Sequence, residues 1–322
     1  MDDDVKPVVK LLLYATDDPA LAERIHADFP EVDLVIARDE DEALRGIVDA
    51  DAMYGKITPD VLAAARWLRW VQSPAIGLEM TMFPELIAHP LILTNPRGIF
   101  SDGISDHVLA LVTGFARQLP FLIRQQLKGS WEPAKFRPIH LPDCTLGIVG
   151  LGGIGAAVAH RAAAFGMRVI AVDARRTERP EAVNELWPAD QLPRLLAQSD
   201  FVVICAPETP ETRGLFGAAA FRTMKQSAYL INIGRGKIVH LDALVDALQA
   251  GEIAGAGLDV FEIEPLPSHH PLWEMENVVI TPHIAGVGPP IAERRHQVLI
   301  ENLRRFIADE PLLNVVDKAS WF

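Results

Sequence analysis

Cysteine and long apolar runs are both scarce in this sequence. Its 322 residues include two cysteines, Cys144 and Cys205, which lie far apart and match no metal-ligand spacing or disulfide framework. We therefore predict no metal site and interpret both as small core residues in a reducing compartment. No stretch approaches the ~20 consecutive apolar residues of a membrane-spanning helix. The N-terminal MDDDVK is acidic where a secretory signal is basic, so the expected location is the cytoplasm.

Positive charge is also in deficit. The chain carries 30 Lys and Arg against 43 Asp and Glu, a formal net charge of -13. Binding to nucleic acid or to an anionic membrane surface requires a basic surface, so we expect neither partner. An anionic small molecule would need a local positive site.

Apolar residues, in contrast, are plentiful and arranged as short runs. With 49% hydrophobic and 23% charged residues, the chain has the composition of a globular protein, and its length suits two domains of about 150 residues each. Strand-like runs between Val8 and Asn95 alternate with amphipathic stretches such as residues 20–29 and 60–65. This alternation predicts a parallel sheet with helices on its faces. The predicted strands are VVKLLLYA, DLVIA, DAMYG, WLRWVQS and LILTN.

A second α/β series follows a long helical stretch. The pattern of residues 101–128 predicts a helix with Ser101 or Asp102 as N-cap and a kink at Pro120. Residues 129–143 show neither strand nor helix periodicity, and we expect them to form a connector. From Thr145 the sequence predicts six strands, the number of a dinucleotide-binding doubly wound sheet. They are TLGIVG, MRVIAVD, DFVVICA, AYLINIG, GAGLDVF and NVVITPH. A helix is predicted at residues 291–307.

The clearest motif is GIVGLGGIG, in which a glycine pattern comes directly after an apolar strand. Gly150, Gly152 and Gly155 supply the G-x-G-x-x-G pattern, in which the glycines permit a tight turn and a close approach of a pyrophosphate to the backbone. The helix beginning near Gly153 would direct free N–H groups at the phosphates. Asp173, at the end of the next strand, stands where a carboxylate binds the adenosine ribose, so the pattern predicts a dinucleotide site.

The residues after Asp173 bear on which dinucleotide is bound. Asp173 repels the 2′-phosphate of NADP and so favours NAD. Arg175 and Arg176 follow it, and an arginine there can bind that phosphate. We predict NAD as cofactor, with NADP as the open alternative.

A nicotinamide cofactor implies hydride transfer, so the site must also bind a substrate and move a proton. Three segments at later strand ends offer polar side chains: INIGRGKIV with Arg235, LDVFEIEPLP with Asp259 and Glu264, and TPHIAG with His283. In an open α/β sheet, ligands bind beyond the carboxyl ends of the strands.

Together these segments resemble one known family. GIVGLGGIG, INIGRGKIV, GLDVFEIEPLP and TPHIAG, in this order and spacing, are similar to the motifs of the D-isomer-specific 2-hydroxyacid dehydrogenases. The resemblance implies an NAD(P)-dependent oxidoreductase acting on the CH–OH group of 2-hydroxy acids. It implies two Rossmann-like or flavodoxin-like domains with parallel sheets. Residues 1–100 and 287–322 would form the substrate domain, with residues 101–286 inserted as the NAD(P)-binding domain.

The same resemblance assigns roles to individual residues. Arg235 would bind the substrate carboxylate, His283 would be the acid/base and Glu264 its partner. The backbone at Ile76 and Gly77 would hold the substrate carboxylate from the other domain, alongside Arg235 and His283. Besides the three motif glycines, the residues implied to line the cofactor are Gly153, Ile154, Asp173, Ala206, Ile233, Arg235, Asp259 and His283.

The chemistry of the reaction suits these three catalytic residues. Reducing a 2-oxo acid adds a hydride at carbon and a proton at oxygen, and histidine is the side chain that titrates near neutral pH. A carboxylate bound to the imidazole fixes its tautomer and favours its protonated form. Arginine can grip a carboxylate with its planar fork and stabilise charge at the reacting oxygen.

We interpret the remaining candidates as structural residues. Two departures from the usual sequence of the family bear on substrate choice. We interpret His107 as an interface or core residue, His269 and His270 as exposed loop residues, and Trp273 as core filler. Where many family members carry Ser/Thr-Ala-Gly-Val-Asp, this chain has AIGLE at residues 75–79, so Ile76 brings bulk beside the site. Ser-Asp-His at residues 105–107 replaces a usual Ala-Glu-His.

Among possible functions, glyoxylate or hydroxypyruvate reduction is the leading hypothesis. Glu264 counts against a formate dehydrogenase, which would carry Gln beside the histidine. A phosphoglycerate-type dehydrogenase and a cofactor-sensing binding protein or corepressor of the same fold are the alternatives. The resemblance also implies a homodimer formed through the cofactor domains, with the helix near Ser101 as a contact.

Overall fold

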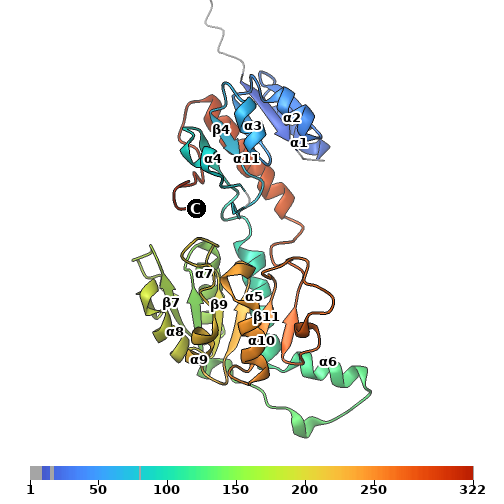
Figure 1. Cartoon of the computed structure of the whole chain (residues 1–322), viewed down its shortest axis with the longest axis vertical. Helices are drawn as coiled ribbons and strands as arrows, with labels where there is room; N and C mark the ends of the chain where they lie inside the picture. The colour runs from blue at the N-terminus through green and yellow to red at the C-terminus, as the bar shows by residue number, and fades with distance from the viewer. Residues whose placement is uncertain (1–8, 15–17, 80, 322) are drawn as a thin grey trace, which may run out of the picture. The chain divides into compact units, whose positions relative to one another are not determined.

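The computed structural model describes residues 9–14, 18–79 and 81–321, which form two compact units (Figure 1). The described residues up to Ile99 and from Pro289 onward form unit 1, and Phe100–Gly288 form unit 2. The acidic N-terminal segment and the ends of the first predicted strand, Val8 and Ala15, lie outside the described residues. No helix in the described part of the chain is long and apolar enough to cross a membrane.

Unit 1 contains a five-stranded sheet in the order β2-β1-β3-β4-β5, and every pairing is parallel. This is the strand order of flavodoxin-like folds. Its strands are β1 (Lys10–Tyr14), β2 (Asp33–Ala37), β3 (Ala52–Tyr54), β4 (Trp70–Gln72) and β5 (Ile92–Thr94).

Helices cover both faces of this sheet. They are α1 (Pro19–Asp28), α2 (Glu40–Gly46), α3 (Pro59–Ala64), α4 (Pro84–Ala88) and α11 (Ile291–Ile307). The strand residues alternate between two cores: Leu12 packs with α2, α3 and α4, and Leu11 and Leu13 pack with α1 and α11. The side chains of Asp18 and Thr58 accept backbone N–H groups at the starts of α1 and α3, each followed by a proline in the first turn.

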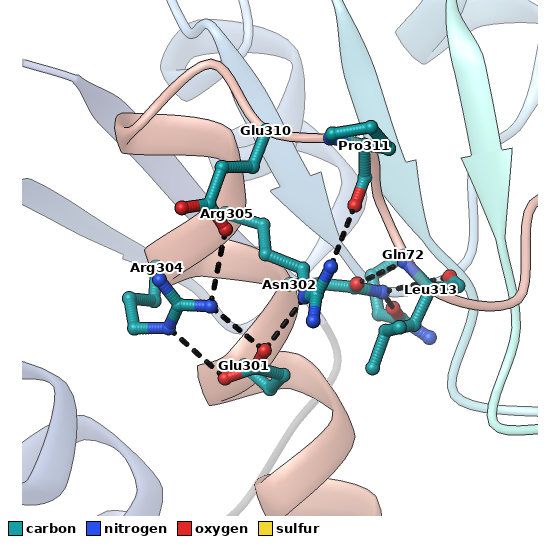
Figure 2. A network of polar contacts seen from close by, with 8 residues as sticks. All are labelled: Gln72, Glu301, Asn302, Arg304, Arg305, Glu310, Pro311 and Leu313. Atoms are coloured by element: carbon teal, nitrogen blue, oxygen red, sulfur yellow. Dashed lines mark hydrogen bonds and ion pairs between the residues drawn. The ribbon is translucent and has the colours of Figure 1, made fainter.

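The C-terminal helix α11 is fixed to the sheet by a buried amide (Figure 2). Asn302 is fully buried, and its Nδ2 donates to Gln72 Oε1 at 2.9 Å and to the Leu313 carbonyl at 3.1 Å. Its Oδ1 accepts the Leu313 N–H at 2.7 Å. Because a buried polar group left unpaired costs roughly 1–3 kcal/mol, these bonds determine how the last helix and the segment after it lie on β4.

Unit 2 contains a seven-stranded parallel sheet in the order β12-β11-β10-β9-β6-β7-β8. The strands are β6 (Thr145–Val149), β7 (Arg168–Asp173), β8 (Glu185–Pro188), β9 (Phe201–Ile204), β10 (Tyr229–Asn232), β11 (Gly255–Leu258) and β12 (Val278–Ile280). The fold class predicted from the sequence is confirmed. The prediction of six strands was wrong by one, because β8, with the sequence ELWP, is a half-exposed edge strand without an apolar run.

Two helical layers sandwich this sheet. One core lies between the sheet and α8, α9 and α10, and the other between the sheet and α5 and α7. The helices are α5 (Ser101–Ala116), α6 (Leu119–Leu127), α7 (Gly153–Ala164), α8 (Leu192–Gln198), α9 (Ala218–Thr223) and α10 (Leu241–Gln249). The 3-10 turns are Pro133–Lys135, Leu141–Asp143, Ala189–Gln191, Gly236–Ile238 and Pro271–Trp273.

The long helix predicted at residues 101–128 is two helices. Gln118 adopts a left-handed backbone with φ 52°, and Pro120 stands in the first turn of α6. Proline suits a first turn because it has no N–H to donate there, so it starts a new helix rather than kinking one. The predicted N-caps were also wrong: the N-cap of α5 is Phe100, which makes no side-chain cap.

The end of α11 yields a pH-dependent stability prediction. Two arginines, Arg304 and Arg305, bind Glu301 at 2.9 and 2.6 Å and lower the pKa of its carboxyl from 4.5 to about 2. A depressed pKa adds stability that is fully present above pH 4.5 and is lost as pH falls towards 2. Glu301→Gln should therefore destabilise the fold by about 0.5 kcal/mol at pH 7, a typical value for an exposed pair.

Thermal unfolding of parent and variant at pH 7, 4 and 3 would test this, with Glu23→Gln as an exposed control in the same unit. The difference between parent and Glu301→Gln should shrink across this series. A difference that is constant with pH would contradict the role of the Glu301 charge.

Candidate active site

The predicted site residues of unit 2 lie at the carboxyl ends of neighbouring parallel strands. Gly150 follows β6, Asp173 ends β7, and Ala206 follows β9. On the next three strands, Ile233 and Arg235 follow β10, Asp259 follows β11, and His283 follows β12. Because all of these strands are parallel and adjacent, the sheet brings the residues to one edge.

The glycine-rich loop after β6 has the geometry of a dinucleotide cradle. Gly150 has φ 93°, and a Cβ on it would lie 2.7 Å from the Ala206 backbone, so only glycine fits this turn. A Cβ on Gly152 would meet nothing within 4 Å, which leaves the backbone open to a phosphate. α7 begins at Gly153, so its free N–H groups lie directly after this loop. The residues present therefore fit a dinucleotide.

Asp173 is bound into the loop on both carboxylate oxygens. Its Oδ2 accepts the Leu151 N–H at 2.7 Å, and its Oδ1 accepts the N–H groups of Arg175 and Arg176 at 2.8 and 2.7 Å. The Arg176 guanidinium donates to the Leu151 carbonyl at 3.0 Å. The Asp173 carboxylate and the Arg176 guanidinium thus bind the N–H and the carbonyl of one loop residue, Leu151.

The segment after β9 forms the wall beside this loop. The Cys205 N–H donates to the Val149 carbonyl at 2.8 Å, and Ala206 lies against Gly150. Burial raises the pKa of the Cys205 thiol to about 12. A thiol that stays protonated at neutral pH is a poor nucleophile, which agrees with the core role predicted for this cysteine.

Arg235 sits on a turn braced by a buried asparagine. Asn232 donates to the Arg235 carbonyl at 3.1 Å and accepts the Gly234 N–H at 3.1 Å. The next residue, Gly236, packs so tightly that a Cβ on it would lie 1.8 Å from the carbonyl carbon of Phe261. The turn carrying Arg235 therefore lies directly against the segment after β11.

That segment carries Glu264, which pairs with His283. Glu264 Oε2 lies 2.7 Å from His283 Nδ1, and Glu264 Oε1 accepts the Phe261 N–H at 2.8 Å. An ionised carboxylate can only accept, so Nδ1 is the donor and Nε2 is left to exchange a proton with a ligand. Both side chains are partly exposed to solvent, so a ligand could reach them.

His283 itself has an unusual backbone. Its φ is 54°, a left-handed conformation that costs a non-glycine residue roughly 1–2 kcal/mol. The buried Asp259 fixes this turn: its carbonyl accepts the His283 N–H at 2.8 Å, and its carboxylate accepts the N–H groups of Ile284 and Ala285, each at 2.9 Å.

The other residues predicted from sequence divide as follows. Ile76 and Gly77 belong to unit 1, after β4, and the Ile76 carbonyl accepts Asn95 Nδ2 at 3.2 Å. His269 is exposed and His270 half-buried. Trp273 is not core filler: it is half exposed, and its indole donates to the Pro267 carbonyl at 3.0 Å, closing the loop that begins with Glu264.

Sequence reasoning missed three residues that shape this edge of the sheet: Thr281, His107 and Asn232. Thr281 Oγ1 donates to Asp259 Oδ1 at 2.6 Å, and His107 Nε2 lies 3.1 Å from that hydroxyl. The position of Thr281, between a strand and the catalytic candidate, was a usable signal. Nothing local to His107 indicated its contact, because 174 residues separate it from Thr281.

Comparison with known proteins agrees with this geometry. Residues 109–285 match the D-isomer specific 2-hydroxyacid dehydrogenase, NAD binding domain. A glyoxylate reductase of Korarchaeum cryptofilum is 38% identical over 84% of this chain and 84% of its own length.

Two solved structures are also similar. A D-isomer specific 2-hydroxyacid dehydrogenase from Xanthobacter autotrophicus, in complex with NADPH and MES, matches with TM-score 0.84 and 33% identity over 97% of this chain and 99% of its own. An NADPH-dependent glyoxylate/hydroxypyruvate reductase from Sinorhizobium meliloti, in complex with NADP and sulfate, matches with TM-score 0.85 and 27% identity over 98% of this chain and 100% of its own.

The fold, the nucleotide cradle and these matches define an NAD(P)-dependent oxidoreductase that acts on the CH–OH group of 2-hydroxy acids. The chain belongs to the D-isomer specific 2-hydroxyacid dehydrogenase family.

Proposed function

We propose that this enzyme reduces small 2-oxo acids, with glyoxylate or hydroxypyruvate as its substrates and His283 as the acid/base. The observation that carries the proposal is the 2.7 Å pair of His283 and Glu264 at the edge that also carries the nucleotide cradle and Arg235. The similarity to curated glyoxylate reductases supports the choice of substrate class.

In the proposed mechanism, a reduced nicotinamide, when bound, would supply the hydride that adds to the carbonyl carbon of the substrate. His283 Nε2 then gives the proton to the carbonyl oxygen, while Glu264 holds Nδ1 and stabilises the imidazolium by its charge. In the reverse direction, neutral His283 takes the hydroxyl proton.

Substrate orientation is assigned to Arg235 and to the segment at Ile76 and Gly77. The Arg235 guanidinium can grip the substrate carboxylate with two parallel N–H donors and place positive charge near the reacting oxygen. Backbone N–H groups at Ile76 and Gly77 are proposed to complete the anion site.

The chain's own residues would hold the cofactor along the sheet edge. The glycine-rich loop and the start of α7 would take the pyrophosphate, with Ile154 on the first turn of that helix. Asp173 would meet the adenosine ribose, and Ala206, Ile233 and Asp259 would line the remainder.

His283→Ala is expected to lower kcat for 2-oxo acid reduction by about 10²–10⁴, the usual contribution of a general acid. NADH affinity, measured by fluorescence titration, should stay close to that of the parent. The assay is a screen of small 2-oxo acids, including glyoxylate and hydroxypyruvate, with NADH and NADPH in parallel.

Glu264→Gln serves as the matched variant, because it keeps a hydrogen-bonding group but removes the charge. kcat for 2-oxo acid reduction should fall with NADH affinity close to that of the parent, since the imidazolium loses the charge that stabilises it. A parent-like kcat would argue against a role for the Glu264 charge. A parent that reduces no 2-oxo acid and captures a specific protein would favour the cofactor-sensing alternative.

For the cofactor, we propose a preference for NADH over NADPH. The Asp173 carboxylate at the end of β7 would repel a 2′-phosphate. Arg176, whose guanidinium donates to the Leu151 carbonyl, is the group that could partly offset this repulsion. The two structural relatives were solved with NADPH or NADP bound.

Asp173→Asn should shift the ratio of NADPH to NADH affinity towards NADPH by about tenfold, which corresponds to about 1.4 kcal/mol. Asparagine keeps one oxygen acceptor for the backbone N–H groups of Arg175 and Arg176 but loses the bond to the Leu151 N–H, so the ratio of the two affinities is the quantity to compare. Arg176→Ala should weaken NADPH more than NADH. Titration of both cofactors measures the ratio; a parent that binds NADPH tenfold more tightly would contradict the role given to Asp173.

We also propose a homodimer formed through unit 2. The apolar residues of α5 are largely buried inside unit 2, where this helix packs against α7. α6 has no buried residue, and it exposes Leu127 at 82%, with Trp131 beyond it at 93%. Figure 1 shows α6 and the segment after it extending away from the rest of unit 2. Large apolar side chains exposed close together, as Leu127 and Trp131 are, are typical of a protein–protein interface.

The double variant Leu127→Asp with Trp131→Ser should lower the mass measured by light scattering from that of a dimer to that of a monomer. Trp67→Ser removes an exposed tryptophan from unit 1 and is the control, which should remain dimeric. A parent that is monomeric at micromolar concentration would rule the proposal out.

A further inference from the structure

His107 is a half-buried histidine on α5 that the proposed mechanism does not use. Its Nε2 lies 3.1 Å from Thr281 Oγ1 and 3.9 Å from Asp259 Oδ1. All three residues belong to unit 2, and Asp259 is 1% exposed. A carboxylate this deeply buried needs donors around it.

The direction of each hydrogen bond in this group follows from the donors available. The Thr281 hydroxyl has one proton, and its 2.6 Å contact with the Asp259 carboxylate takes that proton, because an ionised carboxylate can only accept. Thr281 Oγ1 must then accept from His107, so Nε2 carries a hydrogen. The chain of donors runs from His107 through Thr281 to Asp259.

The register between α5 and β11 explains why His107 reaches this point. Gly257 on β11 has no side chain, and a Cβ there would lie 3.2 Å from the Leu111 and Phe115 side chains. One helical turn from Leu111 to His107 covers about 6 Å, and two strand residues from Gly257 to Asp259 cover about 6.6 Å. The close packing at Gly257 therefore sets His107 opposite Asp259.

One turn closer to the N-terminus of α5, Gly103 lies on the same face of the helix as His107 and Leu111. A Cβ on Gly103 would lie 3.8 Å from the Ala285 carbonyl oxygen. The face of α5 formed by Gly103, His107 and Leu111 thus follows the chain from β11 to the turn at residues 283–285. This face forms a rigid support behind the turn that carries His283.

We propose that His107 is a positioning residue for His283, an inference that rests on the proposed acid/base role. By holding the Thr281 hydroxyl against Asp259 Oδ1, His107 keeps the carboxylate over the N–H groups of Ile284 and Ala285. Those bonds hold His283 in its left-handed conformation, with Nδ1 on Glu264. Without His107, the Thr281 hydroxyl could rotate away from Asp259. The turn at residues 283–285 would then adopt more than one conformation.

Three variants separate this role from ordinary packing. His107→Phe keeps a planar ring but removes the donor. His107→Gln keeps an N–H donor near the position of Nε2, and Thr281→Val removes the hydroxyl while keeping the shape of the side chain. His269→Phe changes an exposed loop histidine and serves as the control.

The first measurement needs no substrate. Hydrogen exchange of the Ile284 and Ala285 amides should accelerate about tenfold in His107→Phe and Thr281→Val, and return to the parent rate in His107→Gln. The double variant His107→Phe with Thr281→Val should exchange no faster than either single variant, because each substitution interrupts the same series of hydrogen bonds from His107 to Asp259. Unchanged exchange in both single variants would overturn the inference.

The second measurement connects the turn to catalysis. In His107→Phe, kcat for 2-oxo acid reduction should fall about tenfold with NADH affinity unchanged, since a small misplacement of a reacting group is enough for this loss. His107→Gln should recover the parent kcat. Faster exchange with parent kcat would overturn the positioning role, and so would a loss that the Gln variant fails to recover.

Failure of the proposed function has a different signature. The parent could bind NADH but reduce no 2-oxo acid, while His107→Phe still accelerates hydrogen exchange at Ile284 and Ala285. That result would support the role of His107 in holding the turn and contradict the acid/base role proposed for His283. His269→Phe should match the parent in both measurements.

Discussion

The buried carboxylate of Asp259 is the constraint on which the arrangement of the site depends. Taking a charge out of water costs several kcal/mol unless donors replace the solvent. Here the donors are the Thr281 hydroxyl and the N–H groups of Ile284 and Ala285. Satisfying this one charge therefore folds the chain after β12 back over the end of β11, and that fold is what brings His283 to Glu264.

At the same edge of the sheet, glycines allow neighbouring backbone segments to pack closely, and no further buried charge is needed for this packing. Gly150 admits the Ala206 backbone, and Gly236 admits the Phe261 carbonyl, so the segments after β6 and β9 touch through their backbones, as do the segments after β10 and β11. Backbone contact leaves few adjustable side chains between the nucleotide cradle, Arg235 and Glu264. The side chains to which we assign the chemistry consequently stand on segments that are fixed by backbone contacts, as precise catalysis requires.

Much of this could be predicted from the sequence because the signals were local. The glycine pattern before α7, the apolar runs of the central strands and the extent of α11 all depend on residues close together in the chain. The family itself was predicted from four linked motifs and is confirmed by the comparisons. The 2.7 Å contact of Glu264 with His283 brings together two residues that the sequence had paired only through the resemblance.

What could not be predicted depends on contacts distant in sequence or on weak local patterns. β8 is an edge strand with no apolar run, so periodicity had nothing to detect. The sequence alone indicated an interface or core residue at His107, and its contact with Thr281 follows only from the packing of α5 on Gly257. A residue's role in such a site is thus set by the register of two elements, which is a property of the folded sheet and helix together. For this reason a role for His283 could be proposed from the sequence, whereas the contact of His107 with Thr281 could not be predicted.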